Sequence, residues 1–234
     1  MAETISFWHR LMQLIAPRAC PVCGQRLAIG EEVVCARCNL HLPRTGFSAD
    51  AYENVMAKRF WGRIPIERAA ALFYYEAGSE VSHIIHDLKY HHHPEIGWEM
   101  GRLTAQEFAR EGFFEGVDLI VPIPLAKRRE RQRGYNQSME IARGVAEVTH
   151  LPLGCRVVRR TRFEGSQTHQ SLQGRMENVE GVFQLSSKAD IQGKHILLID
   201  DIVTTGATIV SCAGELRKGG ASLFSVLSLG FAKS

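Results

Sequence analysis

Two adjacent carboxylates and a glycine-containing turn occur together in residues 195–208, which read HILLIDDIVTTGAT. The apolar run Ile196–Ile199 predicts a central strand of a parallel sheet, and ligands of such sheets bind at the carboxyl ends of the strands. Asp200 and Asp201 would then stand at the mouth of a crevice. Carboxylates there can accept hydrogen bonds from the vicinal hydroxyls of a sugar and help to hold a divalent cation that the ligand brings.

The turn after the acids has the composition of a phosphate-binding loop. Gly206 allows the backbone to approach an anion closely, and the N–H groups at the start of the following helix can bind that anion. The alternative is a turn whose Asp and Thr side chains only cap the helix, which explains a lone Thr-Gly turn better than the whole string. The other residues of this turn are Thr204, Thr205, Ala207 and Thr208.

A dense cationic run lies between the apolar stretch 118–125 and a helical pattern that begins near Gln137. Because the run follows a predicted parallel strand, we expect a loop that opens on the same crevice, where its cations could receive a pyrophosphate group. A solvated charge run and a nucleic-acid surface are the two alternatives. The candidate anion ligands are Lys127, Arg131, Arg133 and Asn136.

Two C-x-x-C pairs near the amino terminus have the spacing of a metal knuckle. Cys20 and Cys23 form the first pair, and Cys35 and Cys38 form the second after eleven intervening residues. Four thiolates suit tetrahedral zinc, and a segment this short would depend on the metal to fold. We therefore predict a structural zinc ribbon, with a redox pair or disulfides as the alternative.

The remaining cysteines and a histidine run carry weaker signals. Cys155 and Cys212 have apolar neighbours in the sequence, which predicts buried small hydrophobic residues without a chemical role. The run His91–His93 predicts a loop between two helices, and metal or phosphate binding is its alternative.

The elements that must position these residues differ between the two halves of the chain. The first half contains an apolar stripe within residues 1–17 that predicts a short amphipathic helix, and a polar, weakly periodic stretch 41–62 that suits a linker. Residues 69–76 predict a strand, and residues 81–90 and 96–109 predict two helices. In the second half, β-branched apolar runs alternate with helical patterns, as in a parallel sheet that is covered on both faces.

Composition limits the class of protein. The chain has 234 residues, 45% hydrophobic and 23% charged, enough for one sizeable core and a smaller appendage. A formal net charge of +3 is too small for wholesale nucleic-acid binding, so an electrostatic function must come from local clusters. The opening residues lack the pattern of an export signal, and no apolar run approaches the roughly 20 residues of a membrane span. We expect a cytosolic protein, where thiols bind metal more often than they pair.

The stretch 195–208 resembles the phosphoribosyl pyrophosphate motif of type I phosphoribosyltransferases. That motif consists of four apolar residues, two acids, two variable residues and T-T-G-x-T, and every fixed position is matched. The resemblance implies that Asp200 and Asp201 hold the ribose hydroxyls, that Thr204–Thr208 hold the 5′-phosphate, and that magnesium accompanies the ligand.

Further motifs resemble one group within this superfamily, the ComF family. Residues 121–138, VPIPLAKRRERQRGYNQS, are similar to its R-G-F/Y-N-Q-S element, and Lys89-Tyr90 resembles its L-K-Y element. The stretch 159–185 resembles a segment that would close over the active site and exclude water, unless it is an ordinary surface loop. Its matched positions are Gln170, Leu172, Arg175 and Asn178.

The ComF resemblance covers almost the whole chain and sets the expected organisation. Residues 1–45 would form the amphipathic helix and zinc ribbon, residues 46–115 a linker and a hood-like helical region, and residues 116–234 the phosphoribosyltransferase-like core. The resemblance implies an α/β fold with a parallel sheet and flanking helices, and a link to bacterial competence and incoming DNA. The acceptor site would lie within about residues 60–115.

Three functions fit this organisation. The first is an enzyme that transfers ribose 5-phosphate from phosphoribosyl pyrophosphate to an unknown base or amine. The second is a sensor that binds the same ligand without turnover. The third is a DNA-handling adaptor whose zinc ribbon and cationic run contact single-stranded DNA or a helicase-type competence partner. The sequence indicates neither the acceptor nor the oligomeric state.

Overall fold

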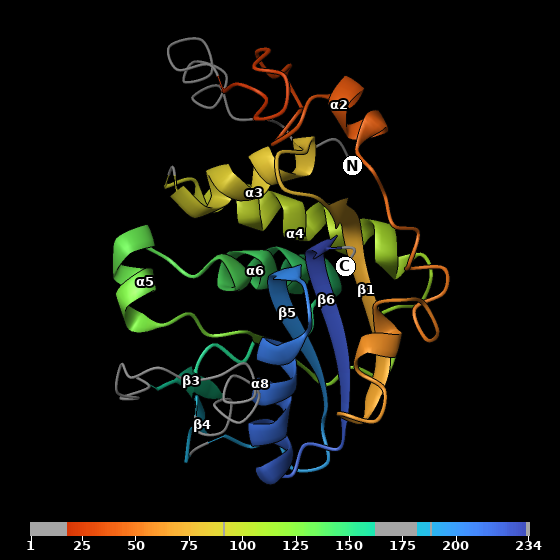
Figure 1. The fold of residues 1–234 in the computed structure, drawn as a ribbon, viewed down its shortest axis with the longest axis vertical. Coiled ribbons are helices and arrows are strands. Elements are labelled where there is room, and N and C mark those ends of the chain that lie inside the picture. The colour runs from red at the N-terminus through yellow and green to blue at the C-terminus, as the bar shows by residue number, and fades with distance from the viewer. Residues whose placement is uncertain (1–17, 91, 162–181, 188, 233–234) are drawn as a thin grey trace, which may run out of the picture.

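A four-stranded parallel sheet forms the centre of the protein, with strand order β1-β6-β5-β2 (Figure 1). The computed structural model describes residues 18–90, 92–161, 182–187 and 189–232. The parallel sheet predicted from the alternating pattern is confirmed. Its strands are β1 (Ile66–Tyr75), β2 (Leu119–Pro122), β5 (His195–Val203) and β6 (Leu223–Ala232).

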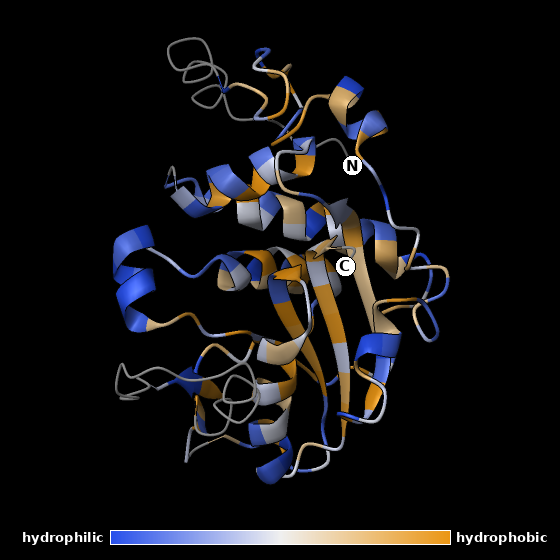
Figure 2. Cartoon of the chain, in the orientation of Figure 1, coloured by the Kyte–Doolittle hydropathy of each residue, from blue (hydrophilic) through white to orange (hydrophobic). Residues whose placement is uncertain are grey.

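The two central strands, β5 and β6, are buried along most of their length, because their residues are apolar or small on both faces. Figure 2 shows the strands of the sheet as a hydrophobic layer. The pairing of β2 with β5 ends at Pro122 and Ile199, whereas β5 continues beside β6 as far as Val203. The last residues of β5 therefore extend past the end of β2, at the carboxyl edge of the sheet.

Helices surround this sheet. Helix α6 contacts β2 and β5, α4 lies against α6 and β6, α3 contacts β1, and α8 contacts β5. In Figure 1, α8 lies in front of the sheet. A short antiparallel pair, β3 (Val158–Arg160) and β4 (Phe183–Leu185), forms a second small sheet. The helices are α2 (Ala36–His41), η1 (Ala57–Arg59), α3 (Glu80–Tyr90), α4 (Pro94–Ala109), α5 (Lys127–Arg133), α6 (Gln137–Thr149) and α8 (Ala207–Lys218).

Two glycines permit the close packing of α4 on α6. A Cβ atom on Gly101 would lie 2.2 Å from the carbonyl oxygen of Ile141, and one on Gly144 would lie 1.9 Å from that of Trp98. Any side chain at these positions would force the two helices apart. This contact fixes α4 and the hood-like region against the helix that follows the cationic run.

The segment predicted as a linker is part of the main core. Phe47, Met56 and Phe60 are buried and belong to the same hydrophobic cluster as the sheet. Strand β1 pairs with β6 from Ile66 to Tyr75, so the sheet extends across the predicted boundary at residue 116. The linker prediction was wrong because several buried positions, such as Ala51 and Asn54, carry small or polar side chains, so the apolar pattern of the segment is weak in the sequence.

The cationic run forms helix α5 rather than a loop. None of its residues is buried, and it ends at Gly134, whose φ of 83° terminates the helix in the left-handed conformation. Helices α3 and α4 match their predicted ranges closely, and Val81, Ile84, Ile85 and Leu88 form the buried face of α3 as expected.

Some predictions fall outside the described residues. The amphipathic helix within residues 1–17 and the closing segment with Gln170, Arg175 and Asn178 both lie there. Within the ranges that the structure describes, no helix is long and apolar enough to cross a membrane.

Candidate functional site

Asp200 and Asp201 lie at the carboxyl edge of the sheet, as predicted, and each is held by contacts from another element. The Asp200 Oδ1 atom accepts hydrogen bonds from the hydroxyl of Ser138, at 3.1 Å, and from the backbone N–H of Asp201, at 2.9 Å. The Asp201 carboxylate forms an ion pair with Lys89, with 2.9 Å between Nζ and Oδ2. Helices α3 and α6 thus both reach the acids at the end of β5.

Burial and a neighbouring negative charge raise the pKa of Asp200. Removal from water raises this pKa most, the carboxylate of Asp201 raises it further, and the resulting value is about 7. Hydrogen bonds from Asp201 and Ser138 and the charge of Lys89 act in the opposite direction. Near neutral pH, a cation or a hydroxyl donor that binds beside this pair would therefore favour the ionised form of Asp200.

The turn after the acids places a glycine in the left-handed conformation at the start of α8. Gly206 has a φ of 73° and immediately precedes α8, which begins at Ala207. A side chain at Gly206 would be strained at this φ, and its Cβ would lie 2.7 Å from the ring of Phe60. The loop Thr204–Thr208 therefore presents the amino end of a 12-residue helix next to the two acids.

The segment around α5 is tied to the end of α3. The hydroxyl of Tyr135 donates a hydrogen bond to the carbonyl oxygen of Leu88, and the guanidinium of Arg133 lies 5.4 Å from the ring centre of Tyr90. Arg133 also donates a hydrogen bond to Gln137. These contacts hold the cationic residues next to Lys89, which reaches Asp201 from the same turn of α3.

Asn136 has a structural role in this segment. Its side-chain oxygen accepts a hydrogen bond from the N–H of Ser138 at the start of α6, and its amide nitrogen donates one to the carbonyl of Ile123. Both ends of the amide are occupied, so Asn136 caps α6 and anchors the segment to the end of β2. Lys127 and Arg131 are exposed on α5.

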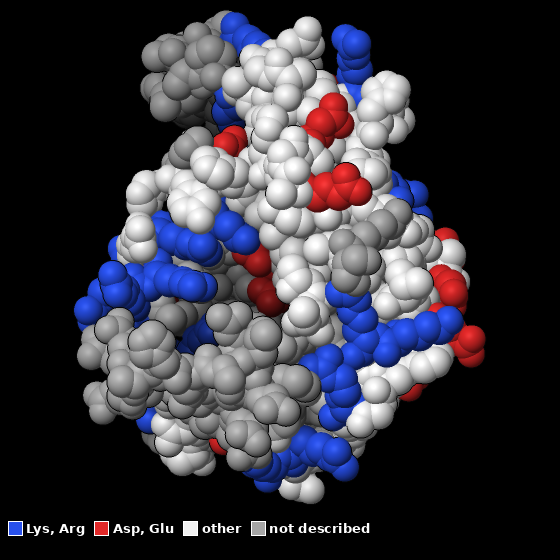
Figure 3. All heavy atoms as spheres, viewed as in Figure 1, with Lys and Arg blue, Asp and Glu red and all other residues white. Residues whose placement is uncertain are grey.

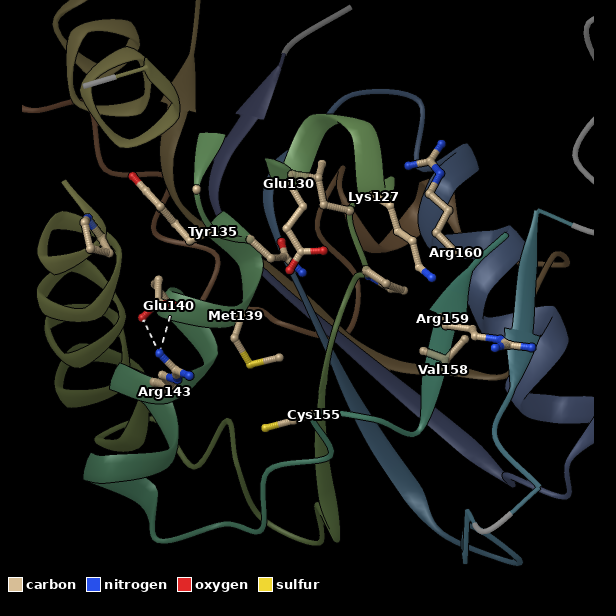
Figure 4. A pocket seen from close by; sticks show the side chains of 15 residues that line it. Lys127, Glu130, Tyr135, Met139, Glu140, Arg143, Cys155, Val158, Arg159 and Arg160 are labelled. Atoms are coloured by element: carbon tan, nitrogen blue, oxygen red, sulfur yellow. Dashed lines mark hydrogen bonds and ion pairs between the residues drawn. The ribbon is translucent and has the colours of Figure 1, made fainter. Parts of the chain in front are cut away.

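A cavity of about 650 Å³ lies between α5, α6 and β3 (Figure 4). Lys127 and Glu130 line it from α5, Met139 lines it from α6, and Cys155 lines it just before β3. The two acids and the phosphate loop are not among its lining residues. Cys155 is exposed there, so the prediction that it is buried was wrong, whereas Cys212 is buried as expected. The apolar neighbours of Cys155 in the sequence belong to a strand edge that faces this space.

Arg160 lines the cavity from β3 and is half-buried. Burial and the neighbouring cation Arg129 lower the pKa of Arg160, and the negative charge of Asp200 opposes this shift. A half-buried guanidinium group near a second cation favours the binding of an anionic ligand, because the anion offsets both positive charges. Figure 3 shows the corresponding surface, where Lys and Arg side chains gather over α5 beside a hollow with acidic atoms.

The four cysteines of the amino-terminal pairs converge. Their sulfur atoms all lie within 4.8 Å of one another, and those of Cys23 and Cys35 are 3.8 Å apart. Thiolates about 2.3 Å from a tetrahedral zinc ion lie about 3.8 Å apart, so the arrangement fits that ion. Cys35 also caps α2 by accepting a hydrogen bond from the N–H of Cys38. All four cysteines are free of disulfides.

The sequence of the region that contains this site matches a known family. Residues 88–231 match the family model described as "Phosphoribosyl transferase domain". This match includes Lys89, both acids, the phosphate loop and the whole of α5. The chain belongs to the phosphoribosyl transferase family. The match spans β2, β5 and most of β6, whereas β1 of the same sheet precedes the matched residues.

Curated relatives of this chain are named for DNA utilization and for competence, in agreement with the ComF resemblance of its sequence. The chain is 29% identical to the DNA utilization protein YhgH of Escherichia coli (strain K12), over 92% of this chain and 98% of that protein. It is 35% identical to the Competence protein ComFC of Bacillus subtilis (strain 168), over 47% of this chain and 43% of that protein. The first of these relatives spans the cysteine pairs as well as the transferase domain.

Solved structures include distant neighbours. A glutamine phosphoribosylpyrophosphate amidotransferase from B. subtilis is 23% identical with a TM-score of 0.40, over 59% of this chain and 26% of that chain. A purine phosphoribosyltransferase from Pyrococcus horikoshii is 16% identical with a TM-score of 0.36, over 58% of this chain and 73% of that chain.

Several residues of the site carry no role in the sequence analysis. Ser138 is the last residue of the R-G-Y-N-Q-S element and Lys89 belongs to the L-K-Y element, so the motifs contain both, but their contacts with the acids could not be inferred from spacing. Arg160 lies at the start of the ComF-like stretch 159–185, but its place beside the cavity could not be inferred from the motif, because it depends on the packing of segments that are far apart in the sequence.

Proposed function

We propose that this ComF-family protein binds phosphoribosyl pyrophosphate and transfers its ribose 5-phosphate group to a nitrogen acceptor. Asp200 and Asp201 would bind the ribose hydroxyls, Thr204–Thr208 the 5′-phosphate, and the cations of α5 the pyrophosphate. The observation that carries the proposal is that both acids lie next to the glycine turn at the start of α8, at the carboxyl edge of the sheet, where Lys89 of α3 and Ser138 of α6 contact them.

These residues would promote the reaction by positioning the ligand and by stabilising negative charge. A nitrogen lone pair of the acceptor would form a bond to C1 of the ribose while the bond from C1 to the pyrophosphate oxygen breaks, and the acceptor would release a proton. Holding the 5′-phosphate and pyrophosphate at two fixed points would align C1 for this displacement. Cations near the departing oxygen, including Arg160, would stabilise its developing negative charge.

The carboxylates also suit a magnesium ion bound to the ligand. Asp200 and Asp201 offer hard oxygen atoms at the carboxyl edge of the sheet, which fits a cation that shares its coordination with phosphate groups. The bound ion would neutralise part of the pyrophosphate charge. Lys89 also lies in this region, where its ammonium group forms an ion pair with Asp201.

The cysteine cluster supports a structural zinc ion. Its four sulfur atoms all lie within 4.8 Å of one another, and the segment contributes only a few residues to the main core. Cys20, Cys23, Cys35 and Cys38 would hold the ion, which would stabilise the fold of residues 18–42. The cytosolic location predicted from the sequence agrees with free thiols but stays a prediction.

A screen for pyrophosphate release tests the proposed activity. The protein would be incubated with phosphoribosyl pyrophosphate and magnesium, with individual nucleobases, amines and ammonia as acceptors. We expect at least one acceptor to increase pyrophosphate release above the rate without acceptor, and Asp200→Asn to abolish that increase. Binding without release for every acceptor would favour the sensor function instead.

A DNA-handling role is the second candidate. The names of the relatives refer to competence and DNA utilization, and α5 exposes cationic side chains without burying any residue. A cationic surface of this kind could contact the phosphates of single-stranded DNA or an acidic face of a helicase-type partner. The two roles need not exclude each other, because the ligand pocket and the outer face of α5 can be occupied together.

A further inference from the structure

Two arginines from the segment before β1 bind the backbone of the phosphate loop. Arg59 donates a hydrogen bond to the carbonyl oxygen of Thr204, and the Nη1 atom of Arg63 donates one to that of Thr205, at 3.1 Å. The partners are 145 and 142 residues apart in the sequence. The loop therefore receives two charged donors from a segment that carries no phosphate-binding motif.

The planarity of the peptide bond gives these contacts a directional effect. In a trans peptide the carbonyl oxygen and the following N–H point to opposite sides, and the described residues contain no cis peptide. Holding the Thr204 carbonyl toward Arg59 directs the N–H of Thr205 away from it. Holding the Thr205 carbonyl toward Arg63 does the same for the N–H of Gly206. Two successive N–H groups are thus turned to the side opposite the arginines.

Phe60 fixes the loop between the two arginines. Its side chain is fully buried, and a Cβ atom on Gly206 would lie 2.7 Å from its ring. The aromatic ring therefore occupies the space that the missing side chain leaves. It limits the movement of the loop toward the arginines.

Arg59 is itself anchored to the end of the sheet. Its Nη2 atom donates a hydrogen bond to the carbonyl oxygen of Ala232, at 3.1 Å, and its guanidinium lies 4.4 Å from the ring centre of Phe231. Both residues belong to the end of β6, next to the strand that leads into the phosphate loop. The position of Arg59 is therefore set by the sheet rather than by the loop.

We propose that Arg59, Phe60 and Arg63 are positioning residues that hold the phosphate loop in its anion-binding conformation. The proposal rests on the proposed function and deepens it by assigning recognition of the sugar 5′-phosphate partly to this segment. The arginines orient the N–H donors, and their charges raise the positive potential behind the loop. They do not need to contact the ligand.

The test compares two ligands that occupy different parts of the site. Ribose 5-phosphate probes the loop, and magnesium pyrophosphate probes the cations of α5, and each is titrated calorimetrically. Arg63→Ala is the informative variant, because Arg63 is exposed and its loss leaves no cavity. Lys58→Ala is the matched control, because Lys58 lies over the ring of Trp61, at 5.7 Å, instead of reaching the loop.

We expect Arg63→Ala to weaken ribose 5-phosphate binding by about tenfold, the loss associated with one charge-assisted hydrogen bond, while pyrophosphate binding changes by less than about twofold. Lys58→Ala should leave both affinities unchanged. Arg63→Lys keeps the charge and a donor, and it should recover part of the lost affinity.

The outcomes separate this inference from the proposed function. An Arg63→Ala variant that binds ribose 5-phosphate as the wild type does would overturn the inference alone. Equal loss of both ligands would also overturn it, because general damage to the fold would then explain the result. A wild-type protein that binds neither ligand would contradict the proposed function itself. If Arg63→Ala does not fold, two other variants test the inference. Folded Arg63→Lys and Phe60→Leu variants that both bind ribose 5-phosphate with the affinity of the wild type would overturn it.

Discussion

Burial and the neighbouring carboxylate of Asp201 both disfavour the ionised form of the Asp200 side chain. Its pKa of about 7 in the folded protein lies above the usual value for an aspartate. As the pH rises, Asp200 loses its proton at a lower pH in the unfolded chain than in the folded protein. The contribution of Asp200 to the free energy of unfolding is therefore fully present below the unfolded pKa and is lost as the pH rises through about 7.

Replacement of this carboxyl should stabilise the protein at high pH. Asparagine can accept the hydrogen bonds from Ser138 and the N–H of Asp201 without carrying a charge. We expect Asp200→Asn to raise the thermal unfolding midpoint at pH 8 by more than at pH 5. Scanning calorimetry at both pH values measures this difference. A difference that is larger at pH 5 would contradict the electrostatic account of the site.

Replacement of Lys89 should destabilise the protein, in contrast to the replacement of Asp200. Its ion pair with Asp201 is largely shielded from water, and it also favours the ionised form of Asp200. We expect Lys89→Met to reduce the free energy of unfolding by about 1–3 kcal/mol at pH 8, because removing one partner leaves a partly buried charge without compensation. At pH 5 the loss should be smaller, because Asp200 then binds a proton.

Denaturant unfolding at the two pH values measures this loss, with Lys58→Met as the control for an exposed lysine. A loss of equal size at both pH values would argue against coupling between Lys89 and the two acids. The contact itself could not be predicted from the sequence. The L-K-Y element indicates Lys89 as a motif residue, but the distance from α3 to the end of β5 depends on the packing of the whole sheet.

At the scale of elements, we predict that the fold of the cysteine ribbon depends on a zinc ion. We expect the purified protein to contain about one zinc per chain, and Cys35→Ser to lose most of it, because three thiolates bind the ion more weakly. Cys212→Ser is a suitable control, since Cys212 is a buried thiol outside the cluster. Metal analysis by mass spectrometry decides the result. A wild-type protein without metal and with intact disulfides would refute the assignment.

Helix α5 can serve either the ligand or DNA, and a salt series separates the two. If it binds pyrophosphate, replacing Arg131 and Arg133 with Ala should weaken phosphoribosyl pyrophosphate binding and leave DNA binding nearly unchanged. If it binds DNA, the order reverses, and the logarithmic slope of affinity against salt should fall by roughly two units for two lost phosphate contacts. If neither affinity changes, α5 is a solvated surface and the pyrophosphate assignment is wrong.

The elements also differ in how far the sequence predicts them. The sheet and helices α3, α4 and α6 follow from strong apolar periodicity, which reports the buried face directly. Helix α5 contains no apolar residue, so it has no periodic pattern, although its Arg, Lys, Glu and Gln residues favour helix. The segment 41–62 contributes single buried residues such as Phe60 at irregular spacing. The contact between this segment and the phosphate loop forms only when β1 pairs with β6 and completes the sheet.

At the scale of the whole molecule, the sheet brings together segments from both ends of the chain. Residues 59–63 support the loop at residues 204–206, α3 supplies Lys89, and α6 supplies Ser138, while the acids themselves come from β5. The motifs identify the loop and the acids, and the fold adds the residues that orient and neutralise them. A change in the amino-terminal half can therefore alter ligand binding in the carboxyl-terminal half.

Calorimetric titration of phosphoribosyl pyrophosphate with magnesium tests the central claim most directly. The wild-type protein should bind the ligand with saturation. Asp200→Asn combined with Asp201→Asn should bind at least about tenfold more weakly, because each substitution removes a negative charge and one of the two acceptor oxygens that a carboxylate offers to the ribose hydroxyls and to magnesium. Circular dichroism must first establish that the double variant is folded. A folded double variant with the affinity of the wild type, or a wild type that does not bind, would contradict the account.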